Sequence, residues 1–293
     1  MRIAIAGVGK MGASIALRLR ETGHDVHVWN RTAARLAPLV EAGCTAAPSP
    51  KALADASDVV LTILTDRPAQ DAIYDGPQGL LAGNLAGKLV LDMSTVRPED
   101  SIALAAKVRA AGAAFVECPV GGTTGPARQG KLLGLAGGDA ADIARARPLL
   151  DQLCRRVEHV GPVGAGASLK LAVNLPLIVY FQALGESVAL CRHLGHDPAW
   201  LMELLGDTSG AAAIMKTRAP AFAAALGGKL DAPPAFDVDS ICKDLRAMVA
   251  EAKARGTDLP VAARTLEVFE TARREGWGGK DGSTLPAYWG RKG

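Results

Sequence analysis

The chain has 293 residues, of which 49% are hydrophobic and 22% charged, and its formal net charge is +3. This length allows two domains with sizeable cores, and this composition is typical of a soluble protein. The small net charge, without long basic runs, argues against a nucleic-acid partner. The first predicted strand begins at residue 3, which leaves no room for a targeting peptide. We expect no later stretch to reach membrane-spanning length without breakers.

The five cysteines are far apart in the sequence and form no CxxC pair: Cys44, Cys118, Cys154, Cys191 and Cys242. This spacing predicts neither a zinc site nor a disulfide framework. We therefore expect no metal, and a reducing cytoplasm as the setting.

The first elements form a strand, a glycine-rich turn and a helix. An apolar strand at 3–6 precedes the sequence GVGKMG, a helical pattern covers 11–20, and a second strand follows at 25–29. Such a turn lets the chain approach a pyrophosphate, while the amides of the helix N-terminus face the phosphates. Packing alone could also explain the glycines. The predicted cofactor-binding residues are Gly7, Val8, Gly9, Lys10, Met11 and Gly12.

Three polar residues, Asn30, Arg31 and Thr32, follow the second strand, where NAD enzymes usually have a carboxylate for the ribose. A guanidinium can pair with the 2′-phosphate of NADP, whereas a carboxylate would repel it. These residues therefore favour NADP over NAD, with NAD still possible. In the alternative interpretation Arg31 is a solvated charge and Thr32 caps the helix that follows.

Strands and helices alternate through the first half, which predicts a parallel sheet. The expected helices cover 32–43 and 98–111, and the expected strands cover 58–64, 88–93, 114–117 and 132–136. A glycine-rich loop lies at 121–125. These elements predict an α/β Rossmann-like domain over residues 1–162.

The second half is predicted to be all-α. A mostly apolar helix at 167–194 is long enough to join two domains. Asp197 and Pro198 are expected to begin the next helix, and further helices are expected at 239–255 and 261–274. We expect breaks at Pro220 and at the pair Pro233 and Pro234. The all-α domain is assigned to residues 163–293.

Five segments together resemble the β-hydroxyacid dehydrogenase family, which includes 3-hydroxyisobutyrate dehydrogenase and small semialdehyde reductases. They are GVGKMG at 7–12, DMSTVRP at 92–98, CPVGGTTGPARQGKL at 118–132, GAGASLKLAVN at 164–174 and CKDL at 242–245. The resemblance covers nearly the whole chain. It implies an oxidoreductase that uses a nicotinamide cofactor and works as a homodimer or homotetramer.

By this resemblance Lys170 is the catalytic lysine and Asn174 is its partner. Their spacing of four places both side chains on one face of a helix. When hydride reaches a carbonyl carbon, a nearby ammonium can stabilise the oxygen and donate a proton. Burial at a domain cleft would lower the pKa of Lys170 toward the neutral form needed for the reverse reaction. Without the resemblance, a lone lysine is usually a solvated charge.

Further site residues are also assigned by the resemblance. Leu64, Thr65, Thr95 and Lys243 are predicted to contact the cofactor, and Ser94, Gly121, Gly122, Thr123 and Asn174 the substrate. Alternatively, Ser94 or Thr95 caps the following helix, the glycines form only a tight turn, and Lys243 lies on the surface. The loop departs from the family, because many relatives have Ser-Gly-Gly here and the semialdehyde reductase branch has arginine where this chain has Gly122. Backbone amides and Thr123 can still bind a carboxylate.

The predicted function is the NADP-preferring interconversion of a small acidic aldehyde or keto acid and its hydroxy acid. An imine reductase is one alternative, although such enzymes typically replace the lysine. A catalytically silent NADP-binding sensor or scaffold is another.

Overall fold

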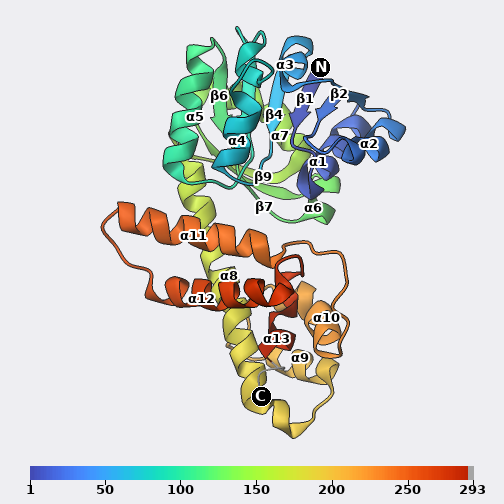
Figure 1. Cartoon of the computed structure of the whole chain (residues 1–293), viewed down its shortest axis with the longest axis vertical. Coiled ribbons are helices and arrows are strands. Elements are labelled where there is room, and N and C mark those ends of the chain that lie inside the picture. The colour runs from blue at the N-terminus through green and yellow to red at the C-terminus, as the bar shows by residue number, and fades with distance from the viewer. Residues whose placement is uncertain (290–293) are drawn as a thin grey trace. The chain divides into compact units, whose positions relative to one another are not determined.

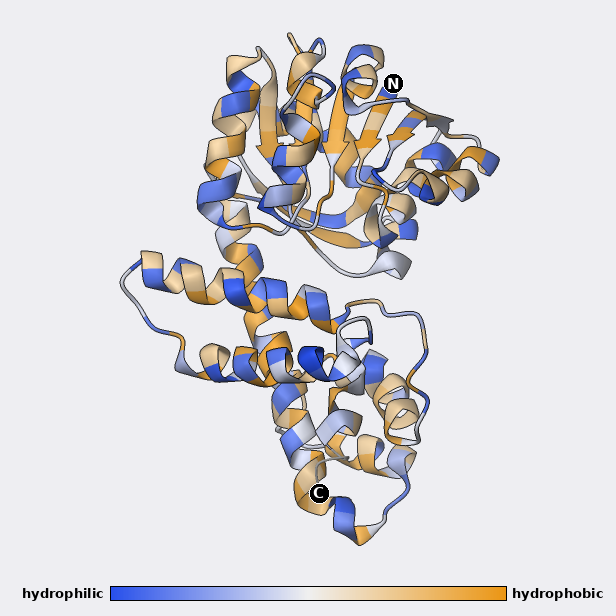
Figure 2. Cartoon of the chain, viewed as in Figure 1, coloured by the Kyte–Doolittle hydropathy of each residue, from blue (hydrophilic) through white to orange (hydrophobic). Residues whose placement is uncertain are grey.

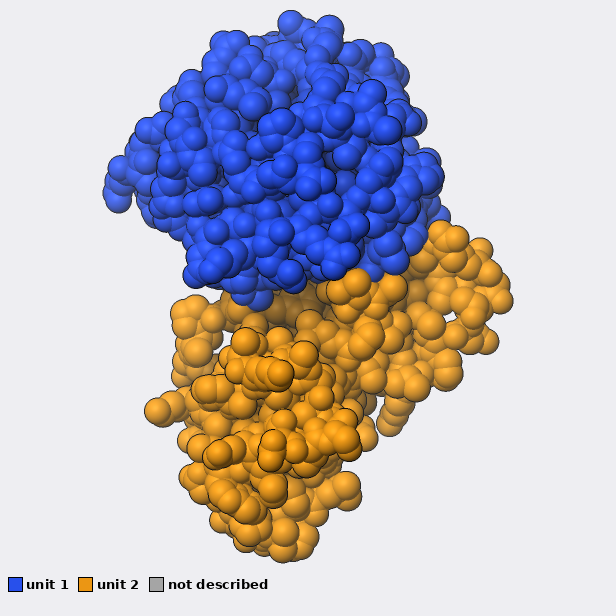
Figure 3. Space-filling model, turned by 180° about the vertical axis from the view of Figure 1, so that it is seen from behind, with its two compact units in different colours: residues 1–171 blue, residues 172–293 orange. Residues whose placement is uncertain are grey.

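The computed structural model describes residues 1–289. The chain divides into two compact units, Met1–Leu171 and Ala172–Gly293 (Figure 3). The division falls inside the long helix α8, Ala165–Cys191, so that this helix begins in unit 1 and continues into unit 2.

Unit 1 contains a nine-stranded sheet in the order β3-β2-β1-β4-β5-β6-β8-β7, with β9 paired to β8. Its strands are β1 Arg2–Ala6, β2 Asp25–Trp29, β3 Thr45–Ala46, β4 Val59–Thr62, β5 Leu89–Asp92, β6 Ala114–Glu117, β7 Val120–Gly121, β8 Leu132–Gly137 and β9 Cys154–Gly161. The six neighbouring strands β3-β2-β1-β4-β5-β6 form a parallel sheet, as predicted. In contrast, β8 runs antiparallel to both β6 and β7. β9, which was not predicted, extends the sheet parallel to β8.

Helices cover both faces of this sheet (Figure 1). They are α1 Lys10–Glu21, α2 Ala37–Glu41, α3 Pro50–Ala56, α4 Arg67–Tyr74, α5 Pro98–Ala110, α6 Thr124–Arg128 and α7 Ala140–Leu153, with 3-10 turns η1 Ala33–Leu36 and η2 Leu80–Ala82. Alternate residues of β1 enter different cores: Ile3 and Ile5 pack with residues of α1 and α7, and Ala4 and Ala6 with residues of α3, α4 and α5. The central strands β1, β4 and β5 are therefore mostly apolar and buried, as Figure 2 shows.

One expected helix of unit 1 is wrong in its extent. The segment 32–43 forms the turn η1 followed by the five-residue helix α2. Pro38 stands near the start of α2, where its missing N–H and fixed φ suit a first turn but not a helix interior.

Unit 2 is helical, as predicted. It continues α8 and adds η3 Arg192–Leu194, α9 Pro198–Gly206, α10 Met215–Leu226, α11 Val238–Ala254, α12 Pro260–Ala272, η4 Arg273–Trp277, η5 Gly282–Thr284 and α13 Leu285–Trp289. Asp197 caps α9 and Pro198 is its first residue, as expected. The expected break at Pro220 is wrong, because this proline lies inside α10.

The expectation that no stretch reaches membrane-spanning length without breakers is also wrong. Residues Ala165–Leu194 are helical, with a mean hydropathy of 1.4 in their most apolar window, and Pro176 lies inside the helix without ending it. A single helix of this kind is weak evidence for a membrane, because the core helix of a soluble protein has the same length and composition. That the protein has no membrane partner stays a prediction.

Candidate active site

The glycines of the first turn have different roles. Gly7 has φ +96°, and a Cβ there would lie 2.6 Å from the carbonyl oxygen of Ile63. A Cβ on Gly12 would lie 2.1 Å from the carbonyl oxygen of Gly7, so packing requires both glycines. A Cβ on Gly9 would have as its nearest neighbour Nη1 of Arg35, at 4.0 Å. Packing therefore explains Gly7 and Gly12 but leaves Gly9 open to a ligand.

Gly9 is also the N-cap of α1. Among the described residues no side chain caps this helix, and its first turn contains no acidic residue. The amides and the positive end of the helix dipole can therefore receive an anion, which fits the pyrophosphate of a dinucleotide. Of the neighbouring predicted contacts, Val8 is buried in the core, Met11 is half-buried and Lys10 is exposed.

The end of β2 presents cationic side chains. The amide of Asn30 donates a 3.0 Å hydrogen bond to the carbonyl of Thr32, while the side chains of Arg31 and Thr32 are exposed. Thr32 is the N-cap of η1 but makes no side-chain capping bond, so its hydroxyl remains available to a ligand. Arg35 was not predicted from the sequence. Its side chain is exposed, and its guanidinium extends toward Gly9. Its spacing of four from Arg31 was the available signal.

Ser94 connects the ends of β4 and β5. Its hydroxyl donates to Asp92 Oδ1 at 2.6 Å and accepts from the amide of Leu64 at 2.9 Å. Ser94 is only 3% exposed. These bonds fix the backbone of Leu64, a predicted cofactor contact. They also occupy the Ser94 hydroxyl, so its assignment to the substrate stays a prediction that requires an exchange of partners.

Neither hydroxyl residue at the end of β5 is the N-cap of α5. The N-cap is Arg97, so the capping alternative for Ser94 and Thr95 is wrong. Thr95 is half-buried, and Thr65, at the end of β4, is exposed.

A buried carboxyl, Asp92, lies beneath these strand ends. Thr62 Oγ1 donates to its Oδ1 at 2.8 Å, and Gln70 Nε2 donates to its Oδ2 at 2.9 Å. Burial raises the pKa of Asp92 to about 6, against the lowering effect of the hydrogen bonds from Ser94 and Thr62.

The predicted acid-binding loop connects β7 to α6. Gly122 is exposed with φ +123°, and a Cβ there would lie 2.8 Å from Cδ2 of Leu132. The tight turn therefore requires glycine at 122, which excludes an arginine without rearrangement. Gly121 has no such constraint. Thr123 is the N-cap of α6, but its hydroxyl makes no capping bond and can contribute to a ligand site.

Lys170 lies in the second turn of α8 and is only 7% exposed. This burial contradicts the alternative in which it is a solvated surface charge. The first turn of α8 is held by the buried carboxyl group of Glu117, on which three backbone amides converge.

Asn174, one helical turn further along α8, belongs to a buried polar group in unit 2. Its Nδ2 donates to Asp244 Oδ2 at 2.9 Å, and Asp244 Oδ1 lies 2.7 Å from Lys243 Nζ. Asn174 is 8% exposed and Asp244 3% exposed. Asp244 therefore links two predicted site residues from its place on α11. Sequence reasoning missed it, although it follows Lys243 directly.

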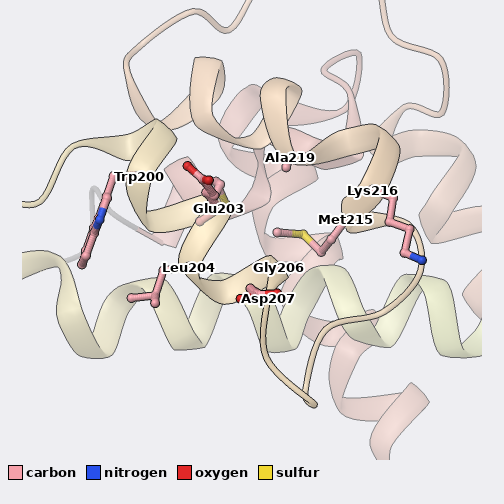
Figure 4. A pocket seen from close by; sticks show the side chains of 9 residues that line it. Trp200, Glu203, Leu204, Gly206, Asp207, Met215, Lys216 and Ala219 are labelled. Atoms are coloured by element: carbon pink, nitrogen blue, oxygen red, sulfur yellow. The ribbon is translucent and has the colours of Figure 1, made fainter.

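A surface pocket of unit 2 lies elsewhere, between α9 and α10 (Figure 4). Trp200, Leu204 and Met215 contribute apolar walls, and Glu203, Asp207 and Lys216 contribute charges. None of the predicted site residues lines it.

Comparison with known proteins decides the family. Residues 2–161 match the model of the NAD-binding domain of 6-phosphogluconate dehydrogenase. Residues 164–289 match that of the NAD-binding region of NADP-dependent 3-hydroxyisobutyrate dehydrogenase. Glyoxylate/succinic semialdehyde reductase 1 of Arabidopsis thaliana is 32% identical over 97% of both chains. The chain belongs to the β-hydroxyacid dehydrogenase family.

Two further relatives agree with this membership. The 3-hydroxyisobutyrate dehydrogenase of Pseudomonas aeruginosa is 33% identical over 91% of this chain and 90% of its own. The solved structure of Psf3 in complex with NADP+ and 2-OPP has a TM-score of 0.87 at 27% identity, covering 98% of this chain and 99% of the other. As a β-hydroxyacid dehydrogenase, the protein is an NAD(P)-dependent oxidoreductase that interconverts a hydroxy acid and its carbonyl compound.

Proposed function

We propose that the protein uses NADPH to reduce a small acidic aldehyde of the semialdehyde type to its hydroxy acid, reversibly, with Lys170 as acid and base. The observation that carries the proposal is the burial of Lys170 and Asn174 one turn apart on α8. Lysine is mostly exposed in folded proteins, so a buried lysine within the family's motif is a candidate for the proton-transfer role.

In the proposed chemistry Lys170 transfers a proton and Asn174 orients the substrate oxygen. A nicotinamide cofactor, which the N-terminus of α1 and Arg31 would hold, would supply the hydride for the carbonyl carbon. The ammonium of Lys170 stabilises the negative charge that grows on the carbonyl oxygen and donates its proton there. In oxidation, neutral Lys170 accepts the hydroxyl proton. Asn174 orients the same oxygen, and Asp244 holds the Asn174 amide through the 2.9 Å bond.

The anionic end of the substrate is assigned to the loop at Gly121, Gly122 and Thr123. Its support is the uncommitted hydroxyl of Thr123 and the exposed glycine at 122. Because the loop lacks an arginine, we expect a compact carboxylate to be bound by backbone amides and one hydroxyl. The preference for NADP is assigned to Arg31, with Thr32 and Arg35 beside it.

A homo-oligomer is part of the proposal. Large apolar side chains are exposed on α8, η3 and α9 of unit 2: Val173, Leu190, Leu194, Trp200 and Leu204, with Leu190 81% exposed. Exposed apolar side chains of this size on a helical unit favour association, and we propose a second copy of the chain as their partner in a cytoplasmic dimer or tetramer.

The test follows NADPH absorbance with purified protein and succinic semialdehyde, methylmalonic semialdehyde, tartronic semialdehyde, sulfolactaldehyde and glyoxylate, with a cyclic imine for comparison. Turnover of an acidic aldehyde that is lost in Lys170→Ala supports the proposal. Turnover of the imine alone indicates an imine reductase. Tight NADPH binding without turnover of any substrate indicates a silent binding module.

A further inference from the structure

The carboxyl group of Glu117 receives hydrogen bonds from two elements. Glu117 is the last residue of β6 and is 1% exposed. Its Oε1 accepts the amides of Gly164 and Gly166, each at 2.7 Å, and that of Ala167 at 3.3 Å. Its Oε2 accepts the hydroxyl of Ser101 on α5. All of these partners are donors, so the carboxyl group of Glu117 is an acceptor in every bond, as an ionised carboxylate is.

The backbone around Glu117 makes room for this carboxyl group. A Cβ on Gly137, its partner on β8, would lie 2.4 Å from Glu117 Oε1. A Cβ on Gly166 would lie 3.1 Å from the same oxygen and 2.4 Å from the carbonyl oxygen of Leu135. Two glycines thus allow the carboxyl group and the start of α8 to approach each other.

The hydrogen bonds between Glu117 and the start of α8 determine where Lys170 lies. An α-helix leaves its first amides without partners, and Glu117 satisfies three of the amides at the start of α8. Lys170 follows Gly164 by six residues, which at 1.5 Å per residue is roughly 9 Å along the axis. With three bonds to one oxygen, α8 can neither rotate nor slide without losing a buried charge-assisted hydrogen bond. The burial of Glu117 raises its pKa, while these amides act in the opposite direction.

We infer that Glu117 is a positioning residue for the reaction: it fixes the first turn of α8 and thereby the direction in which Lys170 delivers its proton. The inference rests on the proposed role of Lys170. A displacement of about 1 Å in a reacting group can reduce a rate by roughly a hundredfold. A change at Glu117 is therefore expected to act on kcat more than on cofactor binding.

The test variant is Glu117→Gln, which keeps the size and one carbonyl acceptor but removes the charge. We expect kcat to fall about tenfold or more while KM for NADPH changes less than about threefold, as for a residue that acts on the reacting group. Hydrogen exchange of the amides at 164–170 is expected to become faster. The matched control is Ser49→Ala, which removes the cap of α3, a helix without predicted site residues. It is expected to lower the melting temperature with kcat unchanged.

A double-mutant cycle with Lys170→Ala separates this inference from the proposed function. If Glu117 acts through Lys170, the change to Gln has little effect on the residual rate of Lys170→Ala, measured at high enzyme concentration. An equal loss in both backgrounds, or an unchanged kcat with only a lower melting temperature, would overturn the inference. If Lys170→Ala keeps full turnover, it is the proposed role of Lys170 that fails.

Discussion

Asn174 and Asp244 are 70 positions apart in the sequence, yet the amide of Asn174 donates a 2.9 Å hydrogen bond to the Asp244 carboxylate. The same carboxylate is paired with Lys243 at 2.7 Å. Because Asn174 and Asp244 are both buried, their hydrogen bond fixes the amide of Asn174 in one orientation. In the proposed mechanism, Asp244 thereby determines which atom of Asn174 faces the substrate oxygen.

We expect Asp244→Asn to reduce kcat by roughly tenfold to a hundredfold, since a hydrogen bond to a charged partner contributes about 1.5–3 kcal/mol. Steady-state kinetics with the substrate found in the NADPH screen would measure this. Asp239→Asn is the control on the same helix, because its ion pair with Arg273 is exposed, and its kcat should stay within about twofold. Equal losses in the two variants would contradict the role of Asp244.

Cofactor preference is expected to depend on Arg31. Arg31→Ala should lower kcat/KM for NADPH roughly tenfold to a hundredfold, the equivalent of about 1.5–3 kcal/mol of lost pairing with the 2′-phosphate. The value for NADH should change little. Arg35→Ala should shift the same ratio in the same direction. Arg264→Ala, an exposed arginine of α12, is the control. A parallel loss with NADPH and NADH would refute a specific contact with the phosphate.

The stability of the protein is expected to depend on pH through Asp92. Its pKa is raised by burial from the ordinary 3.8 to about 6 in the folded chain. The folded state therefore binds this proton more tightly than the unfolded state. The contribution is fully present below pH of about 4 and is lost as the pH rises toward and through 6, amounting to roughly 3 kcal/mol. Buried Glu117, whose pKa is also raised, acts in the same direction.

The variant Asp92→Asn should remove the Asp92 part of this dependence. Asn can accept from Thr62 and Ser94 through its oxygen, and it can donate to Oε1 of Gln70, which has no hydrogen-bond partner among residues 1–289. Urea unfolding between pH 5 and 8 should show a smaller loss of stability in the variant than in the wild type. An identical pH dependence in both proteins would show that Asp92 does not titrate in this range.

The start of α8 packs so closely against β8 that a single added methyl group at Gly166 is expected to lower the stability of the protein. Gly166→Ala places a Cβ 2.4 Å from the carbonyl oxygen of Leu135, so the backbone must move. We expect a loss of about 1–3 kcal/mol in the free energy of unfolding, as overpacking generally produces. Gly125→Ala in α6 has no neighbour within 4 Å and should be neutral or slightly stabilising. Thermal unfolding of the two variants would decide.

The exposed apolar side chains of unit 2 predict the assembly state. Leu190→Asp and Leu194→Asp together place charges on side chains that are 81% and 56% exposed, so the folded single chain should tolerate them. Light scattering after size-exclusion chromatography should show a dimer or tetramer for the wild type and a smaller species for the variant. A wild type that is monomeric at micromolar concentration would contradict the proposed association.

The local pattern of the sequence was sufficient for most elements and for several candidate residues. The strands at 3–6 and 25–29 are continuous apolar or alternating runs beside glycine turns, and such patterns depend on neighbouring residues only. The helix at 98–111 begins at a proline and agrees with α5. The family segments placed Lys170 and Asn174 on one helix because their spacing of four is itself a local property.

Tertiary structure alone decided which polar groups meet. Glu117 reaches the start of α8 across 47 positions and Asp244 reaches Asn174 across 70, distances over which no periodicity carries information. The antiparallel pairing of β8 and the continuation of α10 through Pro220 also depend on segments that pack from elsewhere in the chain. Local propensity is weak beside the free energy of burial, so these contacts and conformations follow from the fold as a whole.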